Sequence, residues 1–143
     1  MHGRDCGALI RHIHCAMQKN ANNELRAEDL TFAQVHLLFT LKSLAGKDCP
    51  MKELERKMGV AQSTTAGLVK RCGEKGLIDC FEDPSDRRVK LVRITEKGLL
   101  VCEDTEFKIR RSEERLVKNL SQDERDVLIN LLQKVYSAVS QPE

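Results

Sequence analysis

The feature that most constrains this chain is a change of hydrophobic period at Gly76. Before it, in residues 51–75, apolar residues recur every three or four positions, which is typical of amphipathic helices. After it, polar and apolar residues come close to alternating through Val89, Leu91 and Ile94, which indicates β-strand. The segment EDPSDRR, rich in turn-forming residues, separates two apolar runs. The sequence therefore predicts a β-hairpin over residues 77–94.

Two short helices are predicted immediately before this hairpin. The segment MKELERKM places Leu54 and Met58 on one face, and Gly59 is a C-terminal stop signal. The next segment, AQSTTAGLVKRCGEKG, has an apolar face and a polar first turn. The polar residues of that turn, all expected to be exposed, are Gln62, Ser63, Thr64 and Thr65. Helix, glycine-containing turn and helix form a helix-turn-helix, and the hairpin that follows makes it a winged helix.

Longer helices are predicted on both sides of this region. The expected start signals are an N-cap at Asp5, a capping box of Thr31 and Gln34, a cap at Thr95 and a capping box of Ser121 and Glu124. The first and last helices carry long apolar stripes, whereas the helix after Thr95 becomes very polar. The predicted fold class is mainly α with a small β-hairpin wing.

Composition excludes several classes of protein. The 143 residues fit one domain, and no apolar run reaches the length of a membrane helix, so we expect a cytoplasmic protein. Six cysteines without a CxxC pair are expected to be reduced thiols and give no zinc-site pattern. No nucleotide-binding, metalloprotease or nucleophile-elbow motif is present. We therefore expect no cofactor, no metal site and no enzymatic activity.

Positive charge is concentrated in the middle of the chain. Residues 31–98 contain 13 Lys and Arg against 9 Asp and Glu, whereas residues 99–143 contain 7 against 9. A basic winged helix suits duplex DNA, because the second helix can enter the major groove and the wing can reach the flanking minor groove. The candidate DNA contacts are Gln62, Ser63, Thr64, Thr65, Lys70, Arg71, Arg87 and Arg88, with Asp86 bracing the arginines of the wing.

Three segments carry a resemblance to a known family: LTFAQVHLLFTL, MKELERKMGVAQSTTAGLVKRCGEKGLI and DPSDRRVKLVRITEKG. Together they resemble the MarR-type (multiple antibiotic resistance) transcriptional regulators. The resemblance implies one domain over residues 1–143, with dimerisation helices in 1–30 and 99–143 and a DNA-binding winged helix in 31–98. It also implies a homodimeric repressor of a pseudo-palindromic operator, released by a small aromatic or phenolic effector. By position, the candidate pocket residues are His14, Met17, His36 and Phe39.

The sequence departs from the family pattern in three places. Residues 79–82, DCFE, stand where basic residues are common, so DNA binding is expected to depend more on the wing arginines. Ala61 stands where a capping serine is common, which leaves Ser63 as an alternative cap. Gly67 and Gly73 fall inside the second helix of the helix-turn-helix and are expected to soften it.

Other functions on the same scaffold remain open. Cys15 and Cys6 lie on the first helix, and His12, His14 and Lys19 near Cys15 would favour its thiolate, as a redox-sensing regulator requires. The same histidines with Cys15 and His36 match no standard metal-ligand spacing. A winged helix that binds another protein is the third alternative.

Overall fold

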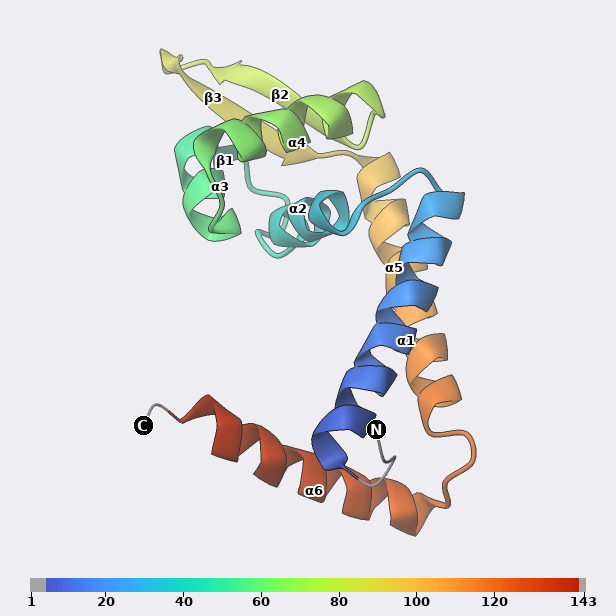
Figure 1. The fold of residues 1–143 in the computed structure, drawn as a ribbon. Coiled ribbons are helices and arrows are strands. Elements are labelled where there is room, and N and C mark those ends of the chain that lie inside the picture. Colours follow the sequence, from blue (N-terminus) through green and yellow to red (C-terminus); the bar gives the residue numbers. More distant parts are fainter. Residues whose placement is uncertain (1–4, 142–143) are drawn as a thin grey trace. The chain divides into compact units, whose positions relative to one another are not determined.

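The computed structural model describes residues 5–141, which form six helices and one three-stranded sheet (Figure 1). The elements are α1 (Cys6–Ala27), α2 (Phe32–Lys42), β1 (Cys49–Pro50), α3 (Met51–Met58), α4 (Gln62–Glu74), β2 (Ile78–Asp83), β3 (Asp86–Ile94), α5 (Glu96–Leu116) and α6 (Gln122–Ser140). Two compact units are present, one ending at Glu103 and one starting at Asp104. The boundary falls inside α5.

The helices begin where the local sequence predicts. The carboxylate of Asp5 caps α1 by accepting a hydrogen bond of 2.9 Å from a backbone N–H two residues on. Thr31 and Gln34 exchange side-chain and backbone hydrogen bonds at the start of α2, and Ser121 and Glu124 do the same at the start of α6. These observations confirm the two predicted capping boxes. A capping box can be predicted from sequence because it involves only residues three positions apart.

The helix-turn-helix consists of α3 and α4, and its turn is made by glycine. Gly59 has φ = 66°, a left-handed conformation that glycine adopts without steric cost, and it ends α3 as predicted. Leu54 and Met58 are buried, and so are Leu68 and Cys72 on α4. These faces join α2 and the sheet in one apolar core. Packing of the apolar face of α4 against α2 and the sheet therefore determines which face of α4 is exposed.

The sheet has the strand order β1-β3-β2 and is antiparallel throughout. Strands β2 and β3 form the predicted hairpin, with Ile78 opposite Ile94 and Phe81 opposite Leu91. Strand β1 was not predicted, since Cys49-Pro50 reads locally as a break between helices. Pairing with β3 creates it, through Cys49 opposite Val92. The wing is therefore attached to the segment before α3 as well as to the end of α4.

The start of α5 packs tightly under the hairpin. Thr95 accepts a hydrogen bond from the Gly98 amide at 3.1 Å, which confirms Thr95 as the cap. A side chain at Gly98 would clash with the carbonyl oxygen of Leu77 and lie 2.7 Å from Cγ1 of Ile94. Only glycine permits this close approach.

The two terminal helices expose large apolar side chains. On α1, Leu9, Ile10, Ile13 and Met17 are exposed, and none of the residues of α6 is buried. Exposed apolar residues of α6 include Val127, Ile129, Leu131, Leu132, Val135, Tyr136 and Val139. None of the helices within residues 5–141 has the length and apolar character needed to cross a membrane.

Candidate nucleic-acid interface

The N-terminal turn of α4 presents polar side chains to solvent. Gln62, Ser63 and Thr64 are exposed, as predicted, and so are Lys70 and Arg71 further along the helix. A side chain added at Gly67 would lie 3.3 Å from a terminal nitrogen of Arg71, so that guanidinium lies directly over the glycine. The exposed face of α4 therefore carries neutral hydrogen-bonding groups first and cations after them.

Thr65 does not belong to this exposed face. Its side chain is 0% exposed and packs toward the core, so its predicted exposure is wrong. The physical reason is helical phase: Thr65 lies three and four residues before Leu68 and Val69, which are both buried. The hydroxyl oxygen of Thr65 also has no hydrogen-bond partner within the described residues.

The start of α4 has no side-chain cap. Ala61 occupies the N-cap position and makes no side-chain hydrogen bond, and Ser63 lies inside the helix, so Ser63 does not replace the missing cap. The first N–H groups of α4 consequently receive no side-chain acceptor from this position. Such groups at a helix start are well suited to face a phosphate oxygen.

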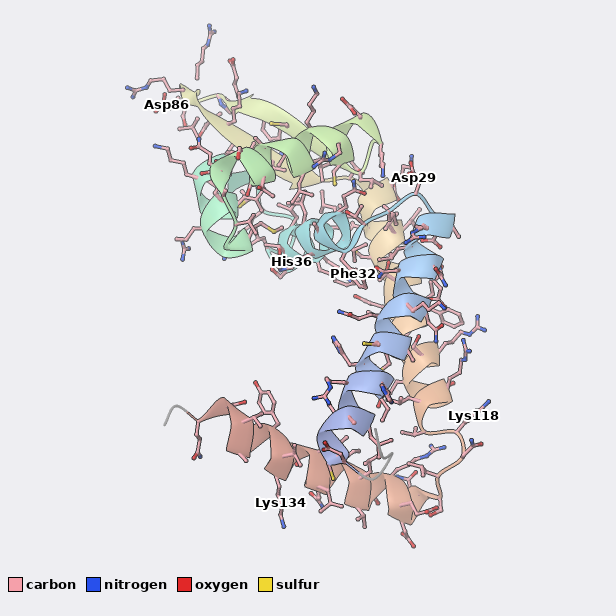
Figure 2. All side chains as sticks on the ribbon, in the orientation of Figure 1. Asp29, Phe32, His36, Asp86, Lys118 and Lys134 are labelled. Atoms are coloured by element: carbon pink, nitrogen blue, oxygen red, sulfur yellow. The ribbon has the colours of Figure 1, made fainter. Side chains whose placement is uncertain are left out.

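The tip of the wing is organised by two aspartates. The Asp83 carboxylate accepts hydrogen bonds from the backbone N–H and hydroxyl of Ser85, at 2.9 and 2.7 Å. The Asp86 carboxylate accepts from Nε and a terminal nitrogen of Arg88, at 3.1 and 3.3 Å, and from the Arg88 backbone N–H. Asp86 lies at the hairpin tip (Figure 2). The predicted bracing role thus has a geometric basis for Arg88, whereas Arg87 has no such contact in the part of the chain described.

These contacts set the electrostatics of the tip. Hydrogen bonds from Arg88 hold the pKa of Asp86 below its usual value, so the carboxylate stays charged at neutral pH. The Arg88 side chain is still 89% exposed, and its guanidinium is oriented rather than covered. An oriented, exposed guanidinium is the form in which arginine enters a narrow minor groove.

The base of the wing holds a third arginine. Nε of Arg93 lies 2.6 Å from Oδ1 of Asp48, and a terminal nitrogen lies 2.9 Å from Oδ2. The Arg93 guanidinium also stands 5.0 Å from the centre of the Phe81 ring. Sequence reasoning missed this cluster, because Asp48 and Arg93 are 45 positions apart and β1, which joins them, has only two residues.

Sequence reasoning also missed Lys90. It is an exposed cation on β3 between the wing tip and Arg93, and no hydrogen bond or ion pair within residues 5–141 engages it. The alternation of polar and apolar residues that predicted the hairpin was sufficient to predict that Lys90 is exposed.

The C-terminal end of α4 is tied to the linker between α1 and α2. Nζ of Lys75 donates hydrogen bonds to Oε1 of Gln34, at 3.0 Å, and to the carbonyl oxygen of Asp29. Asp29, labelled in Figure 2, has φ = 55°, so the linker turns sharply there. Nζ of Lys97 on α5 donates to the carbonyl oxygen of Lys75 at 2.8 Å. Lys75 therefore connects the end of α4 to α2, to α5 and to the linker between α1 and α2.

A cleft of about 500 Å³ opens beside Lys75. The end of α1, the linker, the start of α2 and the last turn of α4 form its walls. The charged and polar lining consists of Arg26, Asp29, Thr31, Gln34, Arg71, Glu74 and Lys75. None of the four predicted pocket residues, His14, Met17, His36 and Phe39, lines this cleft, and their role stays a prediction.

The remaining candidates were the cysteines and histidines of α1. Cys6 and Cys15 are exposed, while Cys49, Cys72 and Cys102 are buried. Burial raises the pKa of the Cys49 and Cys72 thiols, which keeps them protonated. Within residues 5–141 no three His, Cys, Asp or Glu side chains gather in a way that would hold a metal ion.

Comparisons with known proteins agree with this geometry. The model of the MarR family matches residues 30–90. The multiple antibiotic resistance protein MarR of Salmonella typhimurium is 30% identical over 130 residues, which cover 90% of this chain and 89% of that protein. Transcriptional repressor MprA of Escherichia coli is 24% identical, over 94% of this chain and 77% of its own length.

Solved structures share the fold. The PcaV transcriptional regulator of Streptomyces coelicolor is 30% identical, with a TM-score of 0.74 over 94% of this chain and 97% of that one. A mutant of S. aureus MepR bound to an oligodeoxyribonucleotide is 24% identical, with a TM-score of 0.78 over 95% and 99%. The predicted fold class, a winged helix-turn-helix with long terminal helices, is confirmed.

Proposed function

This chain belongs to the MarR family of transcriptional regulators, and we propose that it represses transcription by binding a pseudo-palindromic operator as a homodimer. The observation that carries the proposal is a pair of exposed features: the polar first turn of α4, and after it along the chain a hairpin that holds an arginine in an oriented, exposed state. Neutral donors and acceptors read base edges in the major groove, and the guanidinium enters the adjacent minor groove. The same fold in a MepR mutant was solved with bound DNA, which supports this assignment.

The homodimer is supported by apolar surface that a monomer leaves in water. Large side chains on α1 and α6 are between 44% and 77% exposed, among them Ile10 and Val139. Stripes of this kind are typical of surfaces that pack against a second copy. A two-fold dimer carries two recognition helices, and they fit two half-sites when they are about 34 Å apart.

Release by a small effector is supported by the cleft beside Lys75. Its volume of about 500 Å³ lies in the range of small-molecule sites. Three cations, Arg26, Arg71 and Lys75, line it against two carboxylates, Asp29 and Glu74, and this positive excess favours an organic anion such as an aromatic carboxylate. Lys75 also fastens the end of α4, so a ligand that competes for Lys75 would shift the orientation of that helix.

The test of DNA binding is an equilibrium titration of the full chain with the intergenic DNA next to its own gene. We expect a dimer to bind this DNA at least 1,000-fold more tightly than random duplex, with affinity falling as salt rises. Affinity equal to that for random DNA would reject the operator, and capture of a protein partner in its place would favour the protein-interaction alternative.

The effector is tested in the same titration with benzoate and hydroxybenzoates as probes. We expect at least one aromatic carboxylate to lower operator affinity in the wild type, and Lys75→Met to remove that response. Lys118→Met, which removes an exposed cation outside the winged helix, is the control for the loss of charge. An identical response in wild type and Lys75→Met would place the effector elsewhere, and the four predicted residues His14, Met17, His36 and Phe39 would be tested next.

Redox sensing is a second candidate because Cys15 and Cys6 are exposed thiols on α1. In this alternative an oxidant abolishes operator binding and a reductant restores it. Cys15→Ser is expected to remove the response, with Cys6→Ser as its matched control. A response that survives both substitutions would exclude these thiols.

A further inference from the structure

We propose that Asp48, Arg93 and Phe81 form a wing brace that positions the hairpin on DNA, and that Arg93 is a positioning residue rather than a DNA contact. This inference rests on the proposed function, since it concerns how the wing of a DNA-binding protein is held. It assigns a role to the DCFE segment, residues 79–82, where the basic residues common in the family are absent.

Arg93 has a carboxylate on each side of it: Asp48, which precedes β1, and Asp79 on β2. Cys49 lies opposite Val92, so Asp48 and Arg93 occupy the next position of that ladder. On the other side, Asp79 lies directly opposite Arg93. A bidentate contact to Asp48, at 2.6 and 2.9 Å, then fixes the plane of the guanidinium.

Phe81 adds a third contact to this arrangement. Asp79 lies opposite Arg93, so their side chains share one face of the hairpin. Phe81 is two positions after Asp79 on β2 and therefore points to the same face. The distance of 5.0 Å between guanidinium and ring centre is within the range of a cation–π contact. Planar stacking and bidentate pairing are both properties of arginine that lysine lacks.

The brace joins the wing to a part of the protein that is not in the hairpin. Asp48 immediately precedes β1 and α3, the first helix of the helix-turn-helix. Phe81 and Arg93 belong to the two strands of the wing. The brace adds a side-chain contact to the pairing of β1 with β3 at the base of the wing, and rotation of the hairpin about that base would stretch the Asp48 contact.

The charge of Arg93 is paired with carboxylates at the base of the wing, and its side chain is 51% exposed, against 89% for Arg88 at the tip. The Asp48 hydrogen bonds lower the pKa of that carboxyl group, and Asp48 and Asp79 both raise the pKa of Arg93. Arg87 and Lys90 are exposed as Arg93 is, but unlike Arg93 they make no ion pair in the described part of the chain. Phosphate contacts of the wing are therefore expected from Arg87 and Lys90, while Arg93 sets their position.

The experiment compares full-length Asp48→Asn, Arg93→Lys and Phe81→Leu with the wild type in operator titrations at several salt concentrations. We expect Asp48→Asn and Arg93→Lys each to weaken operator binding by roughly tenfold, with a smaller loss for Phe81→Leu. The slope of log affinity against log salt should stay unchanged, because no phosphate contact is lost. Hydroxyl-radical footprints should lose protection in the flanking minor grooves and keep it over the recognition-helix sites.

A direct contact between Arg93 and DNA would give a different pattern of affinities and salt slopes. If Arg93 contacts a phosphate, Asp48→Asn frees the cation and strengthens binding with a steeper salt slope, and Arg93→Lys leaves binding almost unchanged. Either outcome would overturn the brace.

Three controls separate the brace from other effects. Asp104→Asn removes the same charge from an exposed ion pair on α5 and should leave operator binding unchanged. The double variant Asp48→Asn with Arg93→Lys should be no weaker than the worse single variant, since both break one contact. Wild type that fails to prefer operator over random DNA would reject the proposed function, whereas wild-type preference retained in full by both brace variants would reject the brace alone.

Discussion

The recognition helix α4 and the hairpin wing present one surface, but different forces hold them. Helix α4 is fixed by apolar packing behind it, through Leu68, Val69 and Cys72, and its N-terminal end has no side-chain cap, because Ala61 occupies the N-cap position. The wing, by contrast, is held mainly by polar contacts. Its tip and base are held by hydrogen-bonded ion pairs on the surface, while apolar burial is confined to the end near the core.

This difference predicts which changes each region tolerates. A packed helix responds to volume and to buried polarity, because its position is set by the side chains beneath it. A hairpin held by charge pairs responds to the loss of single carboxylates or guanidinium groups. Substitutions can therefore be chosen that disturb one region and leave the other intact.

The largest effect is expected where the two regions meet, at Gly98. Gly98→Ala places a methyl group against the carbonyl oxygen of Leu77 and 2.7 Å from Ile94, so α5 must move away from the base of the sheet. We expect a loss of about 1–3 kcal/mol in the free energy of unfolding, measured by urea denaturation. Gly73→Ala is the matched control, since an added methyl group there meets no atom within 4 Å and removes a flexible residue from a helix. Equal stability of both variants would show that the junction is not tightly packed.

A second prediction addresses the tip of the wing. Arg88→Ala should weaken operator binding by roughly 10- to 100-fold, because it removes the guanidinium that Asp86 orients and that we propose enters the minor groove. Arg87→Ala should weaken binding by the same amount or less. Replacing the A·T pairs of the flanking minor groove by G·C pairs should reduce the effect of Arg88→Ala, as a double-mutant cycle between protein and DNA would measure. A larger loss for Arg87→Ala would reassign the minor-groove contact.

The third prediction separates Thr65 from its exposed neighbour. Thr65→Val replaces a buried, unpartnered hydroxyl by a methyl group of similar size and should raise the free energy of unfolding by about 1 kcal/mol. Operator affinity should not change. Thr64→Val, one position away and exposed, should leave stability within about 0.5 kcal/mol and weaken operator binding. Thermal denaturation and DNA titration of the pair test both statements, and a loss of DNA binding in Thr65→Val would return Thr65 to the interface.

The same contrast explains how much the sequence predicted. Local signals worked: Thr31 with Gln34, and Gly59 at the end of α3, depend on neighbours within one turn. The predicted exposure of Thr65 was wrong. Three polar residues before it suggested a continuous polar turn, but its position on the helix faces the core. The brace could not be found, because Asp48 and Arg93 meet only after β1 pairs with β3. Packed elements were predictable from periodicity, whereas long-range ion pairs were not.

The last prediction concerns pH and has the smallest effect near neutrality. Arg93 and Arg88 hold the pKa values of Asp48 and Asp86 below the usual 3.8. A carboxyl group whose pKa is lowered by folding contributes to stability above its unfolded-state pKa and loses that contribution as pH falls through the folded-state value. Both contacts should therefore persist at neutral pH and break only in acid below 3.8.

Carbon-detected NMR titration of the two carboxyl groups measures these midpoints directly. Arg93→Leu should return the pKa of Asp48 toward 3.8 and leave that of Asp86 unchanged, and Arg88→Leu should do the reverse. Each variant is thus the control for the other. If Arg93→Leu shifted both midpoints, the base and the tip of the wing would be one coupled network, and the wing brace would extend along the whole hairpin.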